Sequence, residues 1–222
     1  MPERRRGADR GANPGPMPVT TLSPARADAA LTVLCEAFHD YPVMRFVLGA
    51  GPDYDRRLRT LIGFFVTARI LREDLILGCT DDRGDLAAVA LVTLPVRGDP
   101  PEALAVRREA VWQELGSAER TRYEAFGAAA QEFHIGAPHH HLNMIGVRPS
   151  HLGRGHANPL LHQVHALADQ DPNSCGVSLS TESERNVKLY EHFGYHRLGY
   201  ARVAAELETW AMFRPSPSAG RG

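Results

Sequence analysis

The chain has 222 residues, of which 43% are hydrophobic and 23% charged, so it can bury a core and is neither fibrous nor wholly disordered. Lys and Arg total 25 against 26 Asp and Glu, a formal net charge of −1. This balance offers no general attraction to nucleic acid or to an anionic membrane. The length suits one ordinary domain with short tails.

The cysteines and the first residues of the chain indicate the cellular compartment in which the protein is expected. Cys35, Cys79 and Cys175 are widely spaced and odd in number, which favours a reducing compartment over a disulfide framework or a zinc site. No apolar run reaches the roughly 18 residues of a membrane span. The Gly/Pro-rich stretch 7–18 lacks the apolar segment of a secretory signal. We therefore expect a cytoplasmic protein with no membrane partner.

The ends of the chain are predicted to be disordered tails, residues 1–17 and 215–222. They carry few large apolar side chains that could offset the entropy of ordering. A single domain is expected over residues 18–214.

The hydrophobic pattern alternates between helical spacing and short apolar runs. The predicted elements are a strand at 19–22, helices at 24–38, 43–47 and 53–72, a strand hairpin at 75–80 and 86–94, a helical insert at 100–131 that breaks at Gly116–Ser117, a strand at 141–147, a helix at 155–169, a strand at 176–181, a helix at 183–193, and strands at 195–203 and 206–213. This order predicts a mixed α/β domain with one βαβ crossover around residues 141–181 and the helical insert before the central strand.

A loop from Arg148 to Arg154 joins the central strand to the helix that starts at about Gly155, and glycines stand at 153 and 155. Glycine lets the main chain approach a ligand closely, and the first N–H groups of a helix have no intrahelical partner. The helix dipole favours an anion there, so the loop is suited to phosphate oxygens, with Arg154 as an added contact. A tight turn before a helix is the plainer alternative, and on this segment alone the two carry equal weight.

Two segments of the chain match one family pattern in order. The first comprises Val147, Pro149, Gly153, Gly155, Ala157, Leu160 and Leu161, and the second comprises Asn186, Val187, Tyr190, Glu191, Gly194 and Tyr195. In these segments the chain resembles the GCN5-related N-acetyltransferase (GNAT) superfamily, over about residues 139–213. The resemblance implies a GNAT-like, mostly antiparallel sheet flanked by helices.

The resemblance also implies a co-substrate, acetyl-CoA, and residues that bind it. The loop amides of Leu152, Gly153, Arg154, Gly155, His156, Ala157 and Asn158 would hold the diphosphate, and the main chain of Ile145, Gly146 and Val147 would hold the pantetheine and thioester. Tyr190 would give a proton to the leaving thiolate. A core tyrosine with its hydroxyl at the surface is the alternative for Tyr190.

This chain departs from the family pattern at two positions. Leu152 stands where the family has Gln or Arg, which we expect to weaken binding without abolishing it because the contacts are mostly main-chain. Ser183 stands where the family has Asn. We expect its hydroxyl to cap the following helix, which leaves Asn186 as the side-chain contact to CoA.

The base that takes the proton from the amine is left open among His141, Glu182 and a water chain. An imidazole with a pKa near 6.5 suits the task, and Asn143 could order the water; an exposed strand-entry histidine is the alternative. Glu182 is predicted to be a solvated turn residue instead. His162 and His165 are expected on the exposed side of their helix.

No metal is expected, because the adjacent histidines 139–141 alternate faces of a strand and cannot share one ion. Asp40 and Tyr41 could line the acceptor pocket or simply end a helix. The insert at 100–131, with Trp112, Tyr123 and Phe126, is either a lid over the acceptor site or ordinary packing.

Together these features predict an N-acetyltransferase that transfers the acetyl group of acetyl-CoA to a primary amine, of a small molecule, by direct attack in a ternary complex. No cysteine lies in either motif, which argues against an acyl-enzyme. The alternatives are a non-catalytic acyl-CoA-binding or sensor domain and a protein N-terminal acetyltransferase. No nucleic-acid partner is expected; a homodimer is possible, and the identity of the amine is open.

Overall fold

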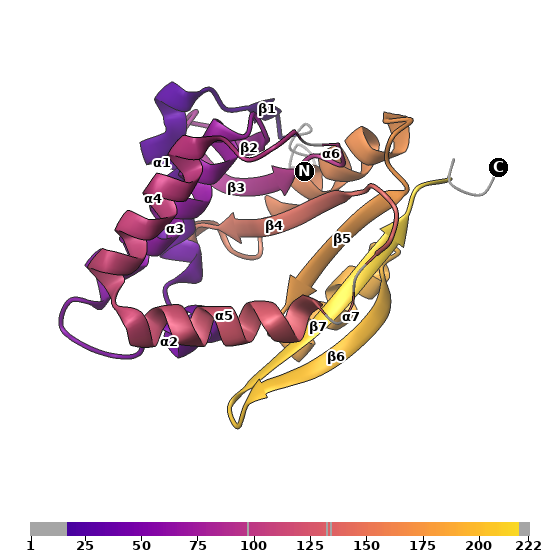
Figure 1. Ribbon diagram of the computed structural model, residues 1–222. Coiled ribbons are helices and arrows are strands. Elements are labelled where there is room, and N and C mark those ends of the chain that lie inside the picture. The colour runs from indigo at the N-terminus through magenta and orange to yellow at the C-terminus, as the bar shows by residue number, and fades with distance from the viewer. Residues whose placement is uncertain (1–16, 97, 132, 134, 218–222) are drawn as a thin grey trace, which may run out of the picture.

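The computed structural model describes residues 17–217 with the exception of 97, 132 and 134 (Figure 1). Most of each predicted tail, residues 1–16 and 218–222, lies outside the described residues. At the C-terminal end the last strand runs to Pro215, and Ser216 is buried with its hydroxyl donating to the Ala168 carbonyl at 3.1 Å. The ordered domain therefore extends slightly past the predicted boundary at 214.

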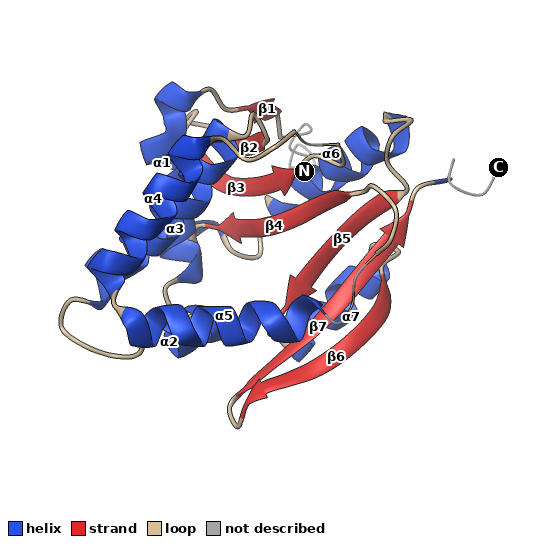
Figure 2. Ribbon diagram, viewed as in Figure 1, coloured by secondary structure: helices blue, strands red, loops and turns tan. Residues whose placement is uncertain are grey.

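Seven strands form one sheet in the order β1-β2-β3-β4-β5-β7-β6. Their bounds are β1 Val19–Thr21, β2 Leu75–Thr80, β3 Leu86–Thr93, β4 His140–Val147, β5 Gly176–Thr181, β6 His196–Ala204 and β7 Leu207–Pro215. Every neighbouring pair is antiparallel except β4 and β5, which are parallel and joined by the predicted crossover (Figure 2). The predicted mixed, mostly antiparallel sheet is confirmed.

Helices cover both faces of this sheet (Figure 2). They are α1 Ala27–Phe38, α2 Pro42–Leu48, α3 Tyr54–Leu71, α4 Glu102–Leu115, α5 Ser117–Gln131, α6 Ala157–Gln170 and α7 Glu184–His192, with short 3-10 helices η1 Pro24–Arg26 and η2 Pro149–His151. The helical insert is confirmed as α4 and α5, which break at Gly116. The helix after the central strand begins at Ala157, two residues later than predicted.

Two hydrophobic clusters lie on opposite faces of the sheet. One gathers buried residues of α1, α2, α3 and α4 together with Met144 of β4. The other gathers residues of α6 and α7 with Leu142 of β4 and Leu179 of β5. Helix α1 lies very close to β4: a Cβ added at Gly146 would meet the Ala37 Cβ at 2.7 Å. Only glycine leaves room for this contact.

Strands β4 and β5 pair only at their first residues. His140, His141 and Leu142 lie opposite Val177, Ser178 and Leu179, and beyond that the two strands separate (Figure 2). The rest of β4, from Met144 to Val147, pairs with β3 on one edge. Its other edge therefore faces a gap in the middle of the sheet, where main-chain groups are left for a ligand.

A β-bulge in β4 lies at the start of this gap. Leu91 of β3 is opposite Met144 while Val92 is opposite Leu142, so Asn143 is an extra residue on β4. The bulge reverses the alternation of side chains along the strand. As a result Leu142 packs in one hydrophobic cluster and Met144 in the other.

None of the helices that the structure describes has both the length and the apolar character needed to cross a bilayer.

Candidate active site

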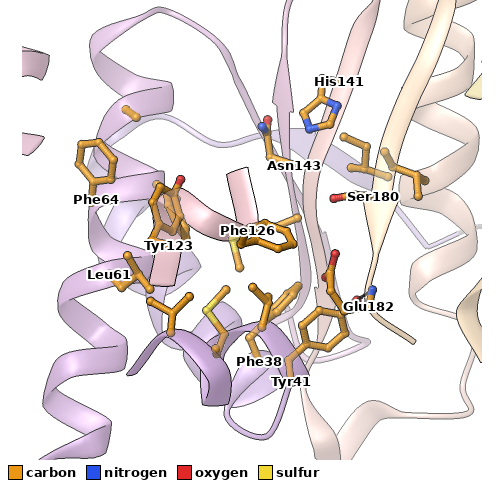
Figure 3. A pocket seen from close by; sticks show the side chains of 18 of the residues that line it. Phe38, Tyr41, Leu61, Phe64, Tyr123, Phe126, His141, Asn143, Ser180 and Glu182 are labelled. Carbon is orange, nitrogen blue, oxygen red and sulfur yellow. Dashed lines mark hydrogen bonds between the residues drawn. The ribbon is translucent and has the colours of Figure 1, made fainter. Parts of the chain in front are cut away.

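A cavity of about 480 Å³ lies where the two hydrophobic clusters meet at the gap between β4 and β5 (Figure 3). One wall comes from α1, α2 and α3, a second from α4 and α5, and the third from β4, β5 and the start of α7. Elements from both faces of the sheet reach it because the sheet is interrupted there. A single hollow thus joins the main-chain edge of β4 to side chains from distant parts of the chain.

Aromatic side chains make up much of the wall. They are Phe38, Tyr41, Phe64, Phe65, Trp112, Tyr123 and Phe126. The Tyr123 ring lies 5.1 Å from Trp112 and 6.0 Å from Phe65, centroid to centroid, which links the insert to α3. An ion pair between Arg57 of α3 and the mostly buried Glu119 of α5 holds the same junction. The insert therefore forms a packed wall of the cavity.

Glu182 follows β5 directly and lines the cavity. Its Oε1 accepts a 2.9 Å hydrogen bond from the Thr209 hydroxyl, and its main-chain N–H donates to the Tyr41 hydroxyl at 3.1 Å. Burial raises the pKa of the Glu182 carboxyl to about 7, although the hydrogen bonds from Thr209 and Tyr41 favour the ionised form. The expectation of a solvated turn residue is wrong, because the chain turns inward after β5.

Tyr190 of α7 is buried and lines the same cavity. Its ring meets Tyr195 edge-on at 5.6 Å. Burial first, and the nearby Glu182 second, raise the pKa of the Tyr190 phenol above its usual value. The phenol therefore keeps its proton at neutral pH. The ring packs in the core, as one of the two alternatives expected, and the residue also lines the cavity; the role of proton donor stays a prediction.

His141 lies at the closed end of the gap, where β4 and β5 still pair. Its Nδ1 is 2.7 Å from the Ser178 hydroxyl, and the residue lines the cavity, as Asn143 does (Figure 3). The alternative of an exposed histidine is wrong, since His141 is half-buried. The Asn143 Oδ1 accepts hydrogen bonds from the Thr93 hydroxyl at 2.8 Å and from Arg69. Both side chains are thus held in place.

The neighbouring histidines have other partners. His140 is buried with its Nδ1 at 2.9 Å from the Ser174 hydroxyl, and the His139 Nδ1 is 2.7 Å from the Ala137 carbonyl oxygen. Among the described residues no group of three His, Cys, Asp or Glu side chains is arranged to hold a metal ion.

The predicted phosphate-binding loop lies between β4 and α6. Gly153 and Gly155 have φ of +74° and +83°, and nothing lies within 4 Å of a Cβ added at either. The amides of Leu152, Arg154 and Asn158 donate within the loop, to Pro149, His151 and Gly155. For the amides of Gly153, Gly155, His156 and Ala157 the described residues supply no acceptor. Of the seven amides predicted to bind the diphosphate, these four N–H groups are therefore available to a ligand.

The side chains of this loop either face solvent or contact neighbouring residues. Leu152 is 64% exposed and carries no donor, and Arg154 is exposed. His151 pairs with Asp81 of the β2–β3 turn at 3.1 Å and meets the His156 ring at 5.2 Å. Burial lowers the pKa of His156, which therefore adds no charge at neutral pH. The loop offers main-chain donors first, with Arg154 as its exposed cation.

The main-chain groups of Ile145, Gly146 and Val147 lie along the open edge of β4, between the loop and the cavity. Ile145 itself lines the cavity. The predicted loop thus follows the strand edge directly along the chain, and the strand edge meets at Ile145 the cavity that Tyr190 also lines. We call the loop, this strand edge and the cavity together the groove.

The start of α7 differs from the expectation at one point. Ser183 precedes the helix, but its side chain makes no capping hydrogen bond, so that prediction is wrong. The Asn186 Nδ2 donates to the Thr181 hydroxyl at 3.3 Å, and Asn186 lines the cavity. It therefore lies beside Glu182, at the cavity end of the groove.

Helix α6 corrects another expectation. His165 is buried, with its Nε2 at 3.1 Å from the Tyr195 hydroxyl, and burial lowers its pKa to about 4. It faces the core because it follows Leu161 by four residues on the apolar stripe. His162 is exposed, as predicted.

The sequence missed the cavity's arginines. Arg69 of α3, Arg72 directly after the end of α3, and Arg108 of α4 all line it. Charged residues on amphipathic helices usually face solvent, so no local signal separated these three from the other arginines. Tyr41, in contrast, was weighed as a pocket residue and lies there, bonded to Thr181 at 3.0 Å.

Comparisons with known proteins agree with this geometry. Residues 114–213 match the family described as acetyltransferase (GNAT) domain. A Corynebacterium glutamicum protein described as histone acetyltransferase HPA2 and related acetyltransferase is 24% identical, with a TM-score of 0.68 over 89% of this chain and 95% of that one. Arylalkylamine N-acetyltransferase 2 from Aedes aegypti is 14% identical, with a TM-score of 0.62 over 89% and 97%.

A Drosophila melanogaster polyamine N-acetyltransferase, which forms N-acetylagmatine, is 17% identical, with a TM-score of 0.57 over 89% of this chain and 98% of that one. No curated protein sequence matches this chain. At these identities the solved structures show the fold, while the family match covers the segment that holds most of the groove. The resemblance seen in the sequence is thereby confirmed: residues 114–213 match the GNAT domain family, and the described part of the chain has the fold of solved GNAT acetyltransferases.

Proposed function

We propose that this protein is an acetyl-CoA-dependent N-acetyltransferase that acts on a primary amine of a small molecule by direct attack in a ternary complex. The observation that carries the proposal is the aromatic cavity at the gap between β4 and β5, into which Glu182 and Tyr190 face. One group there suits taking a proton and the other suits giving one. The family match supports acetyl transfer.

The residues present fit acetyl-CoA. Two glycines with open space at their Cβ positions and four amides with donors to spare form a cradle for a diphosphate at the start of α6. The open edge of β4, from Ile145 to Val147, extends from this cradle toward the cavity. When bound, acetyl-CoA supplies a thioester whose carbonyl carbon takes up the amine as the thiolate leaves. Main-chain N–H groups of the β4 edge would stabilise the charge that develops on the carbonyl oxygen.

Two side chains are proposed to accept the proton of the amine, Glu182 and His141. We favour Glu182, because a pKa of about 7 leaves it basic enough to take a proton and ionised often enough to be ready at neutral pH. Its carboxylate would also attract the incoming ammonium. His141 is the second candidate; its ring is fixed by Ser178 and lies at the other end of the gap.

Tyr190 is proposed to donate a proton to the leaving sulfur. As the C–N bond forms and the C–S bond breaks, the sulfur gains the electron pair of the broken bond and needs a proton. The buried phenol keeps its proton at neutral pH and lies on the α7 side of the groove. Its proton can be replaced from the base once the product leaves.

A small acceptor is favoured over a protein N-terminus by the walls of the cavity. The insert places Trp112, Tyr123 and Phe126 against the side that would otherwise be open. A volume of about 480 Å³ is within the usual range for small-molecule sites. Among fold relatives, one acts on ribosomal protein S18 and another on a polyamine, so the fold by itself does not choose between the two classes.

The test is release of free thiol from acetyl-CoA with a panel of amines, including peptides with free N-termini. The proposal expects turnover with a small amine, and with peptides at least tenfold less. An acyl-CoA sensor would bind CoA in calorimetry and release no thiol with any amine. A cytoplasmic location, a homodimeric assembly and the lack of metal and nucleic-acid partners stay predictions.

A further inference from the structure

The charges that line the cavity are unequal in number. Glu182 is the one acidic residue among the described residues of the lining, against three arginines, Arg69, Arg72 and Arg108. Glu182 is only partly ionised at neutral pH, since its pKa is about 7. The cavity therefore carries a net positive charge. A plain ammonium ion would enter it against that charge.

Only one of the three arginines, Arg69, has protein partners that account for its place in the cavity wall. Arg69 contacts the buried Asp74 through Nε at 3.2 Å, and its Nη1 donates to the Thr93 hydroxyl at 2.8 Å. Among the side chains that the structure describes, no carboxylate lies within ion-pair distance of Arg72 or Arg108. Arg72 is half-buried and Arg108 exposed. These two guanidinium groups are available to an anion in the cavity.

The arginines and Glu182 occupy opposite ends of the cavity. Arg69 is bonded to Thr93, the last residue of β3, and to Asn143, the fourth residue of β4. Arg72 directly follows the last residue of α3, three residues after Arg69. Glu182 follows the last residue of β5. Since β4 and β5 are parallel and Ser178 lies opposite His141, which itself pairs with Thr93, the level of Thr93 is four residues before Glu182 and that of Asn143 is two residues before it. About 7 to 13 Å of strand therefore separates the contacts of Arg69 from Glu182.

We propose that the acceptor carries an acidic group at the end remote from its amine, separated by an apolar or aromatic body, and that Arg72 and Arg108 bind this group. The amine would then lie near Glu182 and the body against the aromatic wall. Carboxylate and other planar oxyanions suit the fork of a guanidinium. The inference builds on the acetyl transfer proposed above and names the class of its acceptor.

The phosphates of CoA are a poor explanation for these arginines. The phosphate cradle follows the last residue of β4, whereas Arg69 contacts its fourth residue, Asn143, and Arg72 continues away along α3. The arginines and the cradle are thus at different ends of the strand.

Binding measured by calorimetry tests the proposal without requiring turnover. The probes are 4-(aminomethyl)benzoate and its homologues with two and three methylene groups, each compared with the carboxamide of the same length at pH 8. We expect the protein to bind the carboxylate at least tenfold more tightly than the amide for one length or more. In an R72Q/R108Q double variant we expect this preference to fall below about twofold.

Arg107→Gln is the matched control, because Arg107 is the neighbour of Arg108 on α4 but does not line this cavity. It should keep the preference for the carboxylate. The single variants R72Q and R108Q should each lose part of it, and thermal melting verifies folding. Equal binding of acid and amide at every length, no binding of either, or a preference that survives in the double variant would overturn the inference. Thiol release reports separately on acetyl transfer, so binding without turnover would count against the enzyme and leave the acidic end of the ligand supported.

Discussion

The two sides of the groove are built in different ways. The side proposed for acetyl-CoA consists of consecutive main-chain groups, from Ile145 along β4 to the glycine loop and the start of α6. The side proposed for the acceptor consists of side chains from α1, α2, α3, α4 and α5 that are far apart in the sequence. A site built from main-chain groups requires glycines at a fixed spacing from the start of a helix. A site built from side chains requires only that the folded chain forms a cavity of the right shape, which many sequences can do. The first kind leaves a motif in the sequence and the second does not.

Tyr190 lies where the two sides meet, and its loss should have the largest effect. In Tyr190→Phe we expect the turnover number to fall about 100-fold or more, since the leaving sulfur loses its proton donor. The affinity for CoA in calorimetry should stay within about twofold. Tyr195→Phe is the control, because Tyr195 is buried in the same cluster but bonded to His165. A Tyr190→Phe variant with normal turnover would leave the groove without its proposed acid.

Glu182 tests the acceptor side. A base works when ionised, so the rate should rise with pH through about 7. In Glu182→Gln we expect a 10- to 100-fold loss of turnover and the loss of this rising limb. His141→Asn, measured in the same way, decides between the two proposed bases. If His141 is the base, this variant and not Glu182→Gln will show the larger loss of turnover and the changed pH profile.

The same carboxyl makes a prediction about stability. Its pKa is higher in the folded protein than the usual value of 4.5, so the folded state binds more protons and stability falls as pH rises from about 4.5 to 7. Glu182→Gln removes that cost. At pH 8 the variant should therefore be more stable than the wild type, by up to about 3 kcal/mol, and at pH 4 nearly equal. Urea unfolding at both pH values measures this; a variant that is less stable at pH 8 would contradict a partly buried Glu182 whose ionisation costs stability.

Gly153 tests the cofactor side alone. Its φ is +74°, where an alanine is strained, and an added methyl group would stand in the proposed cradle. We expect Gly153→Ala to weaken CoA binding about five- to tenfold in calorimetry. Gly49→Ala controls for the strain, since Gly49 has φ +68° and ends α2, away from the loop. Equal CoA affinity in the two variants would mean that the loop is a turn and no more.

Glu119 tests the wall of the acceptor side. Its carboxyl is 15% exposed and binds Arg57 of α3 and Arg122 of α5. Burial would raise the pKa of Glu119, but its own main-chain N–H and the two arginines outweigh that and lower it. We expect Glu119→Gln to destabilise the protein by about 1–2 kcal/mol at pH 7, and by less as the pH falls from the usual carboxyl value of 4.5 through the lowered pKa of the folded state, where the wild-type carboxyl also takes up a proton.

Glu124→Gln is the control for the wall. Glu124 pairs with Arg120 on the exposed side of α5, and loss of such a pair costs about 0.5 kcal/mol or less. If both variants lost equal stability, the junction of α3 and α5 would not depend on its buried ion pair.

Most of the fold could be read from the chain because the local signals agree with one another. The sequence predicted a single structure for each of three segments: a hairpin turn at Asp81–Gly84, a helix break at Gly116 and a buried strand for the continuous apolar run of β3. The structure confirms all three. The wrong predictions concern where helices begin and which side of a helix a residue occupies. The α6 start moved because Gly153 and Gly155 take left-handed φ values. His165 faces inward because it follows Leu161 by four residues on the apolar stripe, where the Tyr195 hydroxyl is its partner.

The sequence by itself determined the order of the elements, the glycine loop and the place of Tyr190, because spacing along one strand, loop or helix fixes where each residue points. Tertiary structure alone decided the acceptor side. The bulge at Asn143, the place of Glu182 in the cavity wall and the gathering of Arg69, Arg72 and Arg108 around the cavity depend on contacts between segments separated by tens of residues. Such contacts leave no periodic trace in the chain, because each is made by a single side chain whose partner is chosen only when the sheet and helices have packed.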